Sequence, residues 1–381
     1  MRIPFFQPCI GEREVEAAIS VLRSGWLTTG HKCREFEERF AELLGGGVET
    51  VAVNSATAGI HLAAEACGIG QGDAVLVPTL TFSATAAAFR YLGAEIVLVD
   101  IDPKSLTIDL DDAKRKWTPQ CKAIAPVHFG GWPCDIDSIL EFARQRNLKV
   151  IEDAAHALPA HRNGRLVGAS GSDACVFSFY ANKTITTGEG GMIATRDPLV
   201  AARARIMRTH GLDRDAFDRF CRAGAGWSYD IVAPGFKYNL TDLAAAIGSV
   251  QLDRVYEFQS RRQAIADLYF EGLANLPLDL PARAPDGGLH SWHLLPIRIR
   301  PEARLNRDEI VALLTEKGIG SSVHYRPLHL MSYWRRERSD DGAGFPAAER
   351  YFAGAVTLPL YPAMRDVDAE EVAAVLRKAL G

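Results

Sequence analysis

The sequence predicts an α/β fold in which a mostly parallel sheet lies between layers of helices, followed by a smaller α+β domain. Short apolar runs alternate with amphipathic stretches from residue 51 to residue 152, which is the pattern of βαβ units. Hydrophobic residues make up 48% of the chain and charged residues 24%, as in an ordinary globular protein. The 381 residues are enough for two domains with a sizeable core.

Two helices come first, at Glu12–Leu22 and Cys33–Leu44, and the loop Ser24–Gly30 joins them. Seven strands of the sheet follow. They are expected at Val51–Val53, Ala74–Pro78, Ile96–Val99, Ala123–Val127, Lys149–Glu152, Ala174–Phe179 and Gly191–Ala194.

The rest of the chain is predicted to be helical first and then mixed. Helices are expected at Pro198–His210 and, as one long helix, at Thr241–Leu273. The later elements are strand Trp292–Ile299, helix Arg307–Lys317, strand Ser321–Val323 and a final helix near Asp368–Leu380. We therefore divide the chain into a large domain, residues 1–255, and a small domain, residues 256–381.

Charge and composition exclude several classes of protein. The chain has 43 basic and 47 acidic residues, a net charge of −4, so nothing indicates a surface for nucleic acid or anionic membranes. No apolar run is long enough to span a membrane and the first residues do not resemble a signal peptide, so we expect a cytoplasmic protein. The seven cysteines have no CxxC spacing, which argues against a zinc site or a disulfide framework.

A phosphate site is predicted where the first strand of the sheet meets a helix. The segment Asn54–Gly59 is small and hydroxylated, and the free N–H groups of a first helical turn bind anions. A plain helix cap at Ser55 or Thr57 would explain the same residues. The GxGxxG signature of dinucleotide folds does not occur at this turn, which argues against a nicotinamide oxidoreductase.

Other polar and aromatic residues are expected at the same edge of the sheet, because ligands bind at the carboxyl ends of parallel strands. Asp153 ends the fifth strand, and an aspartate there could keep a pyridine nitrogen protonated. A helix cap by Asp153 or a polar contact by His156 are the alternatives, and no third ligand supports a metal site. Phe82 follows the second strand and could stack on a flat ring or belong to the core.

Lys183 is the candidate nucleophile. It follows a buried strand in a segment too rich in Thr and Gly for a helix. Loss of solvation favours the neutral amine, which can attack a carbonyl and form a Schiff base. Most lysines are solvated surface charges, so the assignment depends on the phosphate turn, the acid and the aromatic residue around it.

The order of these segments resembles that of the fold type I pyridoxal-phosphate enzymes, and among them the DegT/DnrJ/StrS sugar aminotransferase family. The resemblance covers essentially the whole chain. Its segments are Ser24–Gly30, Asn54–Gly59, Ile151–His156, Ser178–Gly191, His210–Leu212, Gly235–Asp242, Gly318–Gly320, His324–His329 and Leu358–Pro362. Within the family, Ser55–Gly59 and Lys237–Asp242 are most similar to the UDP-4-amino-4-deoxy-L-arabinose aminotransferase type.

The resemblance implies a role for each matching residue. Lys183 would form the Schiff base with pyridoxal 5'-phosphate (PLP), and Asp153 would pair with the pyridine nitrogen. Phe82 would stack on the ring, His156 would lie close to it, and Ala56, Thr57 and Ser178 would hold the phosphate. Family members are homodimers with shared sites, so Asn239 would reach the phosphate of the neighbouring subunit. Two positions differ from the usual family pattern. Many relatives have Trp or Tyr at the position of Phe82, and Tyr180-Ala181-Asn182 is not the commonest sequence before the lysine.

The implied activity is a ping-pong transamination from L-glutamate to a nucleotide-linked keto sugar, which gives an amino sugar and 2-oxoglutarate. The residues similar to the arabinose aminotransferase type favour a substrate with a uridine nucleotide and amination at carbon 4 of the sugar. The segment that contains His324, Tyr325, Arg326 and His329 could hold the diphosphate, or could be an ordinary polar loop. Trp26, Thr28 and Tyr325 are candidates for sugar contacts.

Two alternatives remain on the same scaffold. A PLP-dependent nucleotide-sugar dehydratase is disfavoured because such dehydratases carry histidine where this chain has Lys183. A non-catalytic PLP-binding regulatory protein would keep the cofactor without transferring an amino group.

Overall fold

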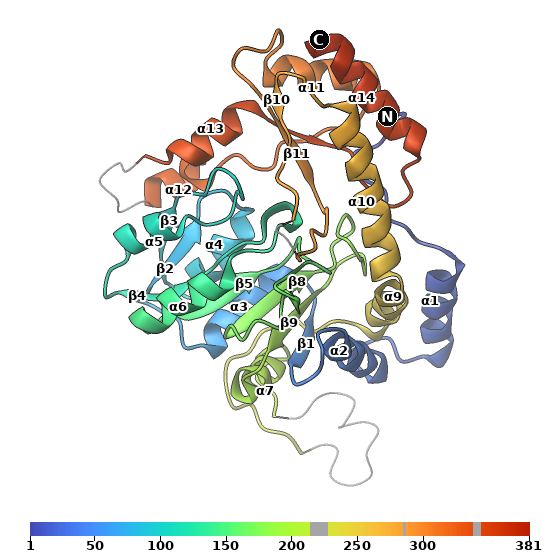
Figure 1. Ribbon diagram of the computed structural model, residues 1–381. Coiled ribbons are helices and arrows are strands. Elements are labelled where there is room, and N and C mark those ends of the chain that lie inside the picture. Colours follow the sequence, from blue (N-terminus) through green and yellow to red (C-terminus); the bar gives the residue numbers. More distant parts are fainter. Residues whose placement is uncertain (214–227, 285–286, 338–343) are drawn as a thin grey trace.

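A seven-stranded sheet in the order β1-β9-β8-β5-β4-β2-β3 forms the centre of the molecule (Figure 1). The computed structural model describes residues 1–213, 228–284, 287–337 and 344–381. The strands are β1 (Glu49–Val53), β2 (Ala74–Pro78), β3 (Glu95–Val99), β4 (Cys121–Ile124), β5 (Lys149–Asp153), β8 (Ala174–Ser178) and β9 (Gly191–Thr195). Only β9 runs antiparallel to its neighbours β1 and β8, whereas the other pairs are parallel. The predicted mostly parallel sheet is confirmed.

Helices cover both faces of this sheet. One face packs against α3 (Ala56–Ala66), α4 (Ser83–Arg90) and α7 (Pro198–Met207). The other face packs against α2 (His31–Leu43) and α9 (Asp242–Asp253) at one end and against α5 (Leu110–Lys116) and α6 (Ile136–Arg146) at the other. Consecutive strand residues point to opposite faces. In β1, Val51 and Val53 belong to the first core and Ala52 to the second, so the second half of this strand is apolar on both faces.

A separate core lies beyond the sheet, at the top of Figure 1. It is built on a small antiparallel sheet of β10 (Leu278–Asp279), β11 (Leu295–Ile299) and β12 (Ala355–Leu358). The helices α10 (Val255–Gly272), α11 (Arg307–Glu316) and α14 (Asp366–Leu380) cover it. Ile3 is also part of this core and forms a bridge with Ile319. The N-terminal segment therefore packs with the C-terminal third of the chain, while the division at residue 255 stays a prediction.

Two helices of the C-terminal third pack against the large sheet instead. They are α12 (Ser332–Glu337) and α13 (Pro346–Gly354). Trp334 and Tyr351 belong to the same cluster as Val75 and Val77 of β2. A helical pattern shows that one face is buried but does not show which neighbour buries it.

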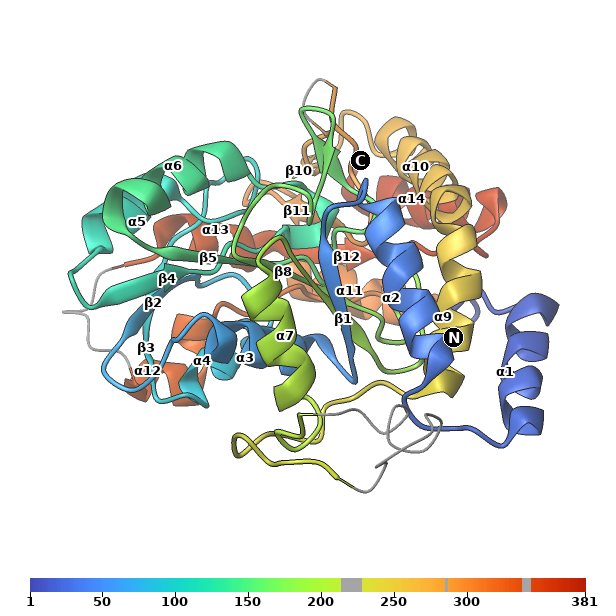
Figure 2. The same cartoon turned by 90° about the horizontal axis from the view of Figure 1, so that it is seen from below.

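Two predicted elements are wrong in detail. The single helix at Thr241–Leu273 is two helices, because Arg254 has φ −103° and ψ 4° and its N–H donates to the carbonyl of Gln251. The break lets α9 pack beside α2 and α1 (Glu12–Ser24), while α10 turns toward the other core (Figure 2). The predicted strand Ser321–Val323 is reduced to one bridge between Ser322 and Thr357.

Smaller elements complete the described chain. They are the hairpin β6 (His161–Arg162) and β7 (Arg165–Leu166) and the 3₁₀ turns η1 (Phe129–Gly131) and η2 (Leu328–Leu330). Within the described ranges, no helix has the length and apolar character needed to cross a membrane.

Candidate active site

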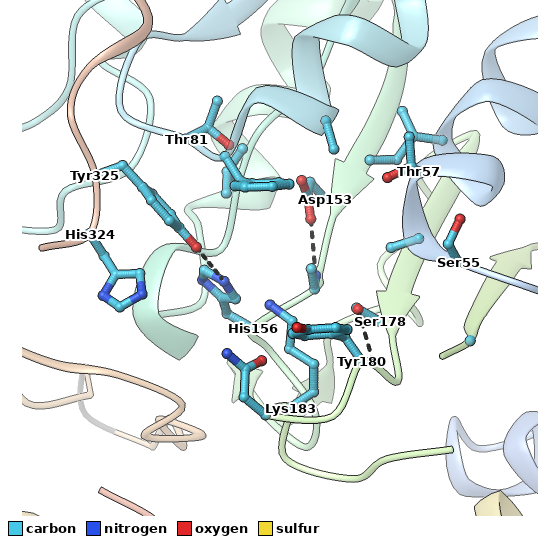
Figure 3. A pocket seen from close by; sticks show the side chains of 18 of the residues that line it. Ser55, Thr57, Thr81, Asp153, His156, Ser178, Tyr180, Lys183, His324 and Tyr325 are labelled. Atoms are coloured by element: carbon cyan, nitrogen blue, oxygen red, sulfur yellow. Dashed lines mark hydrogen bonds between the residues drawn. The ribbon is translucent and has the colours of Figure 1, made fainter. Parts of the chain in front are cut away.

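A cavity of about 470 Å³ opens at the carboxyl ends of the central strands (Figure 3). The sheet edge, the start of α3 and one loop from the C-terminal third supply its walls. Its lining residues are Ser55, Ala56, Thr57, Ile60, Thr81, Phe82, Ala84, Val127, Asp153, Ala155, His156, Ser178, Tyr180, Asn182, Lys183, Glu189, Gly190, His324 and Tyr325. All predicted cofactor contacts except Asn239 therefore meet in one place.

The first turn of α3 forms one end of the cavity. Ser55 caps the helix by accepting a bond from the N–H of Ala58 at 3.2 Å. The N–H groups of Ala56 and Thr57 precede the first intrahelical bond, so they are available to an anion. Gly191 lies so close that an added Cβ would sit 2.8 Å from the main-chain nitrogen of Ala56. Ser178 reaches the cavity from the end of β8 beside this turn.

Asp153 presents its carboxylate to the cavity from the end of β5. Its side chain is held from two sides, by Thr85 Oγ1 at 2.6 Å and by the N–H of Ala155 at 3.0 Å. Thr81 Oγ1 in turn lies 2.7 Å from Thr85 Oγ1. The residue is only 7% exposed, so this carboxylate is fixed in direction and suited to a buried cationic partner.

Lys183 extends its amine into the middle of the cavity (Figure 3). Burial lowers the pKa of this amine to about 8, although the charge of Asp153 acts in the opposite direction. No described residue accepts a hydrogen bond from Nζ, while the main-chain N–H of Lys183 donates to the carbonyl of Tyr180 at 2.9 Å. About a tenth of the amine is therefore neutral at pH 7, far more than for a solvated lysine.

Aromatic rings line the side of the cavity nearest to the C-terminal loop. Phe82 is 61% exposed, and its ring centroid lies 6.0 Å from that of Tyr325. His156 is buried and accepts a bond on Nδ1 from the N–H of Gly130 at 3.2 Å. Burial, and next the charge of Lys183, hold the pKa of His156 well below its ordinary value, so this imidazole is neutral.

Of the predicted substrate residues, His324 and Tyr325 line the cavity. His324 Nδ1 lies 2.9 Å from Thr357 Oγ1, and the ring of Phe5 stacks on it at 5.6 Å. Burial and the charge of Lys183 lower the pKa of His324 to about 4. His324 is therefore neutral near pH 7 and offers hydrogen bonds, not the positive charge that the sequence suggested.

The other four predicted substrate residues do not line the cavity. Arg326 is exposed and donates to the carbonyl of Leu330 at 2.9 Å. His329 is buried, with Nδ1 at 2.7 Å from Thr79 Oγ1 and Nε2 at 3.2 Å from Glu349. Trp26 and Thr28 lie in the loop before α2, where the carbonyl of Thr28 accepts a bond from the N–H of Asp242. A substrate role for these four stays a prediction.

Asn239 also lies outside the cavity of its own chain. Its Nδ2 donates to Thr29 Oγ1 at 2.7 Å, and its Oδ1 accepts a bond from Lys237 at 2.7 Å. The residue forms a bridge with Val53 at the end of β1, on the outer side of the phosphate turn. The prediction that it reaches a neighbouring subunit is not tested by a single chain.

The residues present fit PLP. An anion site, a fixed carboxylate and an unbound amine surround one cavity, as a phosphate, a pyridinium and an aldehyde require. Asn182 Oδ1 is buried in this lining and has no hydrogen-bond partner among the described residues. A buried polar atom without a partner is costly, which is consistent with a site that a ligand completes.

Several residues that line the cavity or support its lining were not singled out from the sequence. Thr85 orients Asp153, and Tyr180, Asn182, Glu189 and Gly190 surround Lys183. Their positions next to Phe82 and Lys183 in the chain were the available signal. Which of two adjacent loop residues faces a cavity depends on the backbone path, and this path has no regular period.

Comparison with known proteins identifies the class. The chain matches the DegT/DnrJ/EryC1/StrS aminotransferase family over residues 8–377 and belongs to this family. It is 41% identical over 377 residues to the spore coat polysaccharide biosynthesis protein SpsC of Bacillus subtilis (strain 168), covering 98% of this chain and 96% of that protein. The protein is thus a PLP-dependent aminotransferase of fold type I.

Solved structures agree with this assignment. The aminotransferase TlmJ from Streptoalloteichus hindustanus is 35% identical and superposes with a TM-score of 0.90, covering 99% of this chain and 98% of that one. Spr1654 from Streptococcus pneumoniae in its PLP form is 32% identical, with a TM-score of 0.89 and full coverage of both chains at 100%. DesI in the presence of its TDP-sugar product is 32% identical, with a TM-score of 0.86, covering 99% of this chain and 92% of that one.

Proposed function

We propose that this aminotransferase moves the amino group of L-glutamate to a nucleotide-linked keto sugar, and that the acceptor is a UDP-4-keto sugar. The observation that carries the proposal is the division of the cavity. The phosphate turn, Asp153 and Lys183 occupy one part of its lining, and His324 and Tyr325 line the part nearest the C-terminal loop (Figure 3). A second, oxygen-rich ligand fits this second part, since its residues offer hydrogen bonds and aromatic faces.

The cofactor site is proposed to use residues at the sheet edge. Ala56, Thr57 and Ser178 hold the phosphate, and Asp153 keeps the pyridine nitrogen protonated. When bound, PLP supplies a carbonyl that binds amines and a ring that takes up electrons from the neighbouring carbon. Phe82, which lines the same cavity, would cover one face of that ring.

Lys183 is the proposed base and acid of the reaction. With PLP bound, Nζ of Lys183 would take a proton from the α-carbon of the amino donor and would deliver it to the aldehyde carbon of the cofactor. The pKa of about 8 lets the same amine hold and release a proton near neutral pH. His156 stays neutral beside it and does not add a competing charge.

The assignment of a nucleotide-linked sugar as substrate rests on related proteins and on two short segments of the sequence. DesI has been solved in the presence of a TDP-sugar product, and SpsC is named for polysaccharide biosynthesis. The segments Ser55–Gly59 and Lys237–Asp242 favour the uridine nucleotide and amination at carbon 4. We further propose a homodimer in which Asn239 completes the phosphate site of the partner subunit.

The experiment follows the two half-reactions separately. L-Glutamate should convert the purified holoenzyme to its pyridoxamine form and release 2-oxoglutarate, and a UDP-4-keto sugar should then restore the original absorption and yield an amino sugar by mass spectrometry. Lys183→Ala should lose the absorption of the lysine-bound cofactor and both half-reactions. A TDP-4-keto sugar used in parallel tests the choice of nucleotide.

The outcomes distinguish the alternatives. Loss of water from the sugar without amino transfer would identify a dehydratase. Tightly bound cofactor that no amino donor converts would identify a regulatory protein. An unchanged absorption spectrum in Lys183→Ala would contradict the assignment of the lysine.

A further inference from the structure

The protonation of His156 is fixed by its surroundings. A main-chain N–H can only donate, and that of Gly130 donates to His156 Nδ1 at 3.2 Å. Nδ1 therefore carries no proton, and the neutral ring must carry its proton on Nε2. The residue is also held in place, because the tilted ring of His293 packs against the His156 ring with centroids 4.4 Å apart and the hydroxyl of Ser291 donates to the main-chain carbonyl of His156.

This tautomer sets the direction of the next hydrogen bond. His156 Nε2 lies 3.3 Å from the hydroxyl oxygen of Tyr325. Since Nε2 carries the proton, it donates, and the Tyr325 oxygen accepts. The hydroxyl proton of Tyr325 then needs another acceptor, and no described residue provides one. Burial raises the pKa of Tyr325, so the hydroxyl keeps its proton.

The hydroxyl lies at the boundary of the cavity. Figure 3 places it above His156, on the side away from Ser55 and Thr57. The Tyr325 ring packs against two other rings. Its centroid lies 6.0 Å from that of the tilted Phe82 ring and 6.1 Å from that of Phe129, which meets it edge to face. A held ring leaves the O–H rotation as the main freedom of this side chain.

We propose that Tyr325 is a specificity-determining hydrogen-bond donor, oriented by His156, for an oxygen acceptor on the ligand at the end of the cavity away from the phosphate turn. The inference rests on the proposed function and adds the direction of one hydrogen bond to it. The Tyr325 hydroxyl binds a ligand oxygen that accepts a hydrogen bond and disfavours a ligand group that can only donate one. Two ligand oxygens have this chemistry, an oxygen of the sugar and the phenolic oxygen of the cofactor. His156 acts through Tyr325 and is a positioning residue.

Tyr325→Phe removes the hydroxyl and leaves the ring. If the acceptor is on the sugar, the sugar half-reaction of the holoenzyme should lose about tenfold in kcat/KM, and the Kd of the UDP-amino sugar by calorimetry should rise by a similar factor, while the glutamate half-reaction is unchanged. If the acceptor is on the cofactor, both half-reactions should change, and so should the pH dependence of the cofactor absorption. Tyr333→Phe is the matched control, since Tyr333 is 44% exposed and does not line the cavity.

A second measurement tests the orientation without activity. In protein labelled with ¹⁵N at histidine, the His156 signals, assigned by their loss in His156→Gln, should show a neutral ring protonated on Nε2. A ring protonated on Nδ1 would overturn the proposal, and so would a Tyr325→Phe enzyme that matches the wild type in both half-reactions, in sugar binding and in absorption. If the wild type accepts no keto sugar at all, the proposed function fails, whereas the tautomer and the absorption still decide the inference.

Discussion

The pKa of Lys183 gives a direct test of how the cavity prepares its nucleophile. With a pKa of about 8, about one amine in eleven is neutral at pH 7. An ordinary lysine with a pKa of about 10.5 would be neutral in about one molecule in three thousand at that pH. The apoprotein should therefore present neutral Lys183 about three hundred times more often than a solvated lysine.

The measurement is competitive acylation of the apoprotein with a trace reagent between pH 6 and pH 11. Mass spectrometry of the Lys183 peptide, relative to the peptide of the exposed Lys104, should give a midpoint about 2.5 pH units below that of a solvated lysine. The charge of Asp153 opposes the effect of burial, so Asp153→Asn should move the Lys183 midpoint lower still.

Two results would refute this reasoning. A wild-type midpoint near 10.5 would mean that water solvates the amine in the cavity. A midpoint that rises in Asp153→Asn would mean that the carboxylate does not stabilise the ammonium form.

Two further predictions concern the phosphate turn and a buried ion pair. Gly191→Ala should weaken PLP binding about tenfold or more, because the new Cβ would lie 2.8 Å from the main chain at the start of α3. The measurement is an absorption titration of the apoprotein with PLP. The control is Gly70→Ala, which has open space around the new Cβ and should bind PLP normally. Arg208→Met should lower the free energy of unfolding by about 3–5 kcal/mol in urea, because Glu37 would lose its buried guanidinium partner. The exposed Arg144→Met should change it by less than about 1 kcal/mol, and an equal loss in both variants would contradict the distinction.

The sequence predicted the large sheet well because its strands are buried on both faces. Ala74–Pro78 is fully buried, and a continuous apolar run between turns has few other interpretations. The strand at Ala355–Leu358 was missed, since a four-residue run between a glycine and a proline resembles any short apolar segment. The strand predicted at Ser321–Val323 is only one bridge, between Ser322 and Thr357. Strand formation depends on pairing with a partner that lies far away in the chain, and the local sequence does not show this partner.

The candidate site divides in the same way. Ala56, Asp153, Ser178 and Lys183 could be placed because each follows or precedes a strand whose end was predictable. The charge of His324 could not be predicted, because its pKa depends on burial created by the folded chain. The sequence also did not show that the His329 ring turns away from the cavity toward Glu349.

The packing of Ile3 beside Ile319 connects the N-terminal segment to the candidate active site. The N–H of Gly320 donates to the carbonyl of Ile3 at 2.8 Å, and five residues after Gly320 the chain reaches Tyr325. Phe5 continues the contact by stacking on His324. The N-terminal segment therefore supports the loop whose His324 and Tyr325 line the cavity. The loop gains its final shape only when residues more than three hundred positions apart in the sequence have come together.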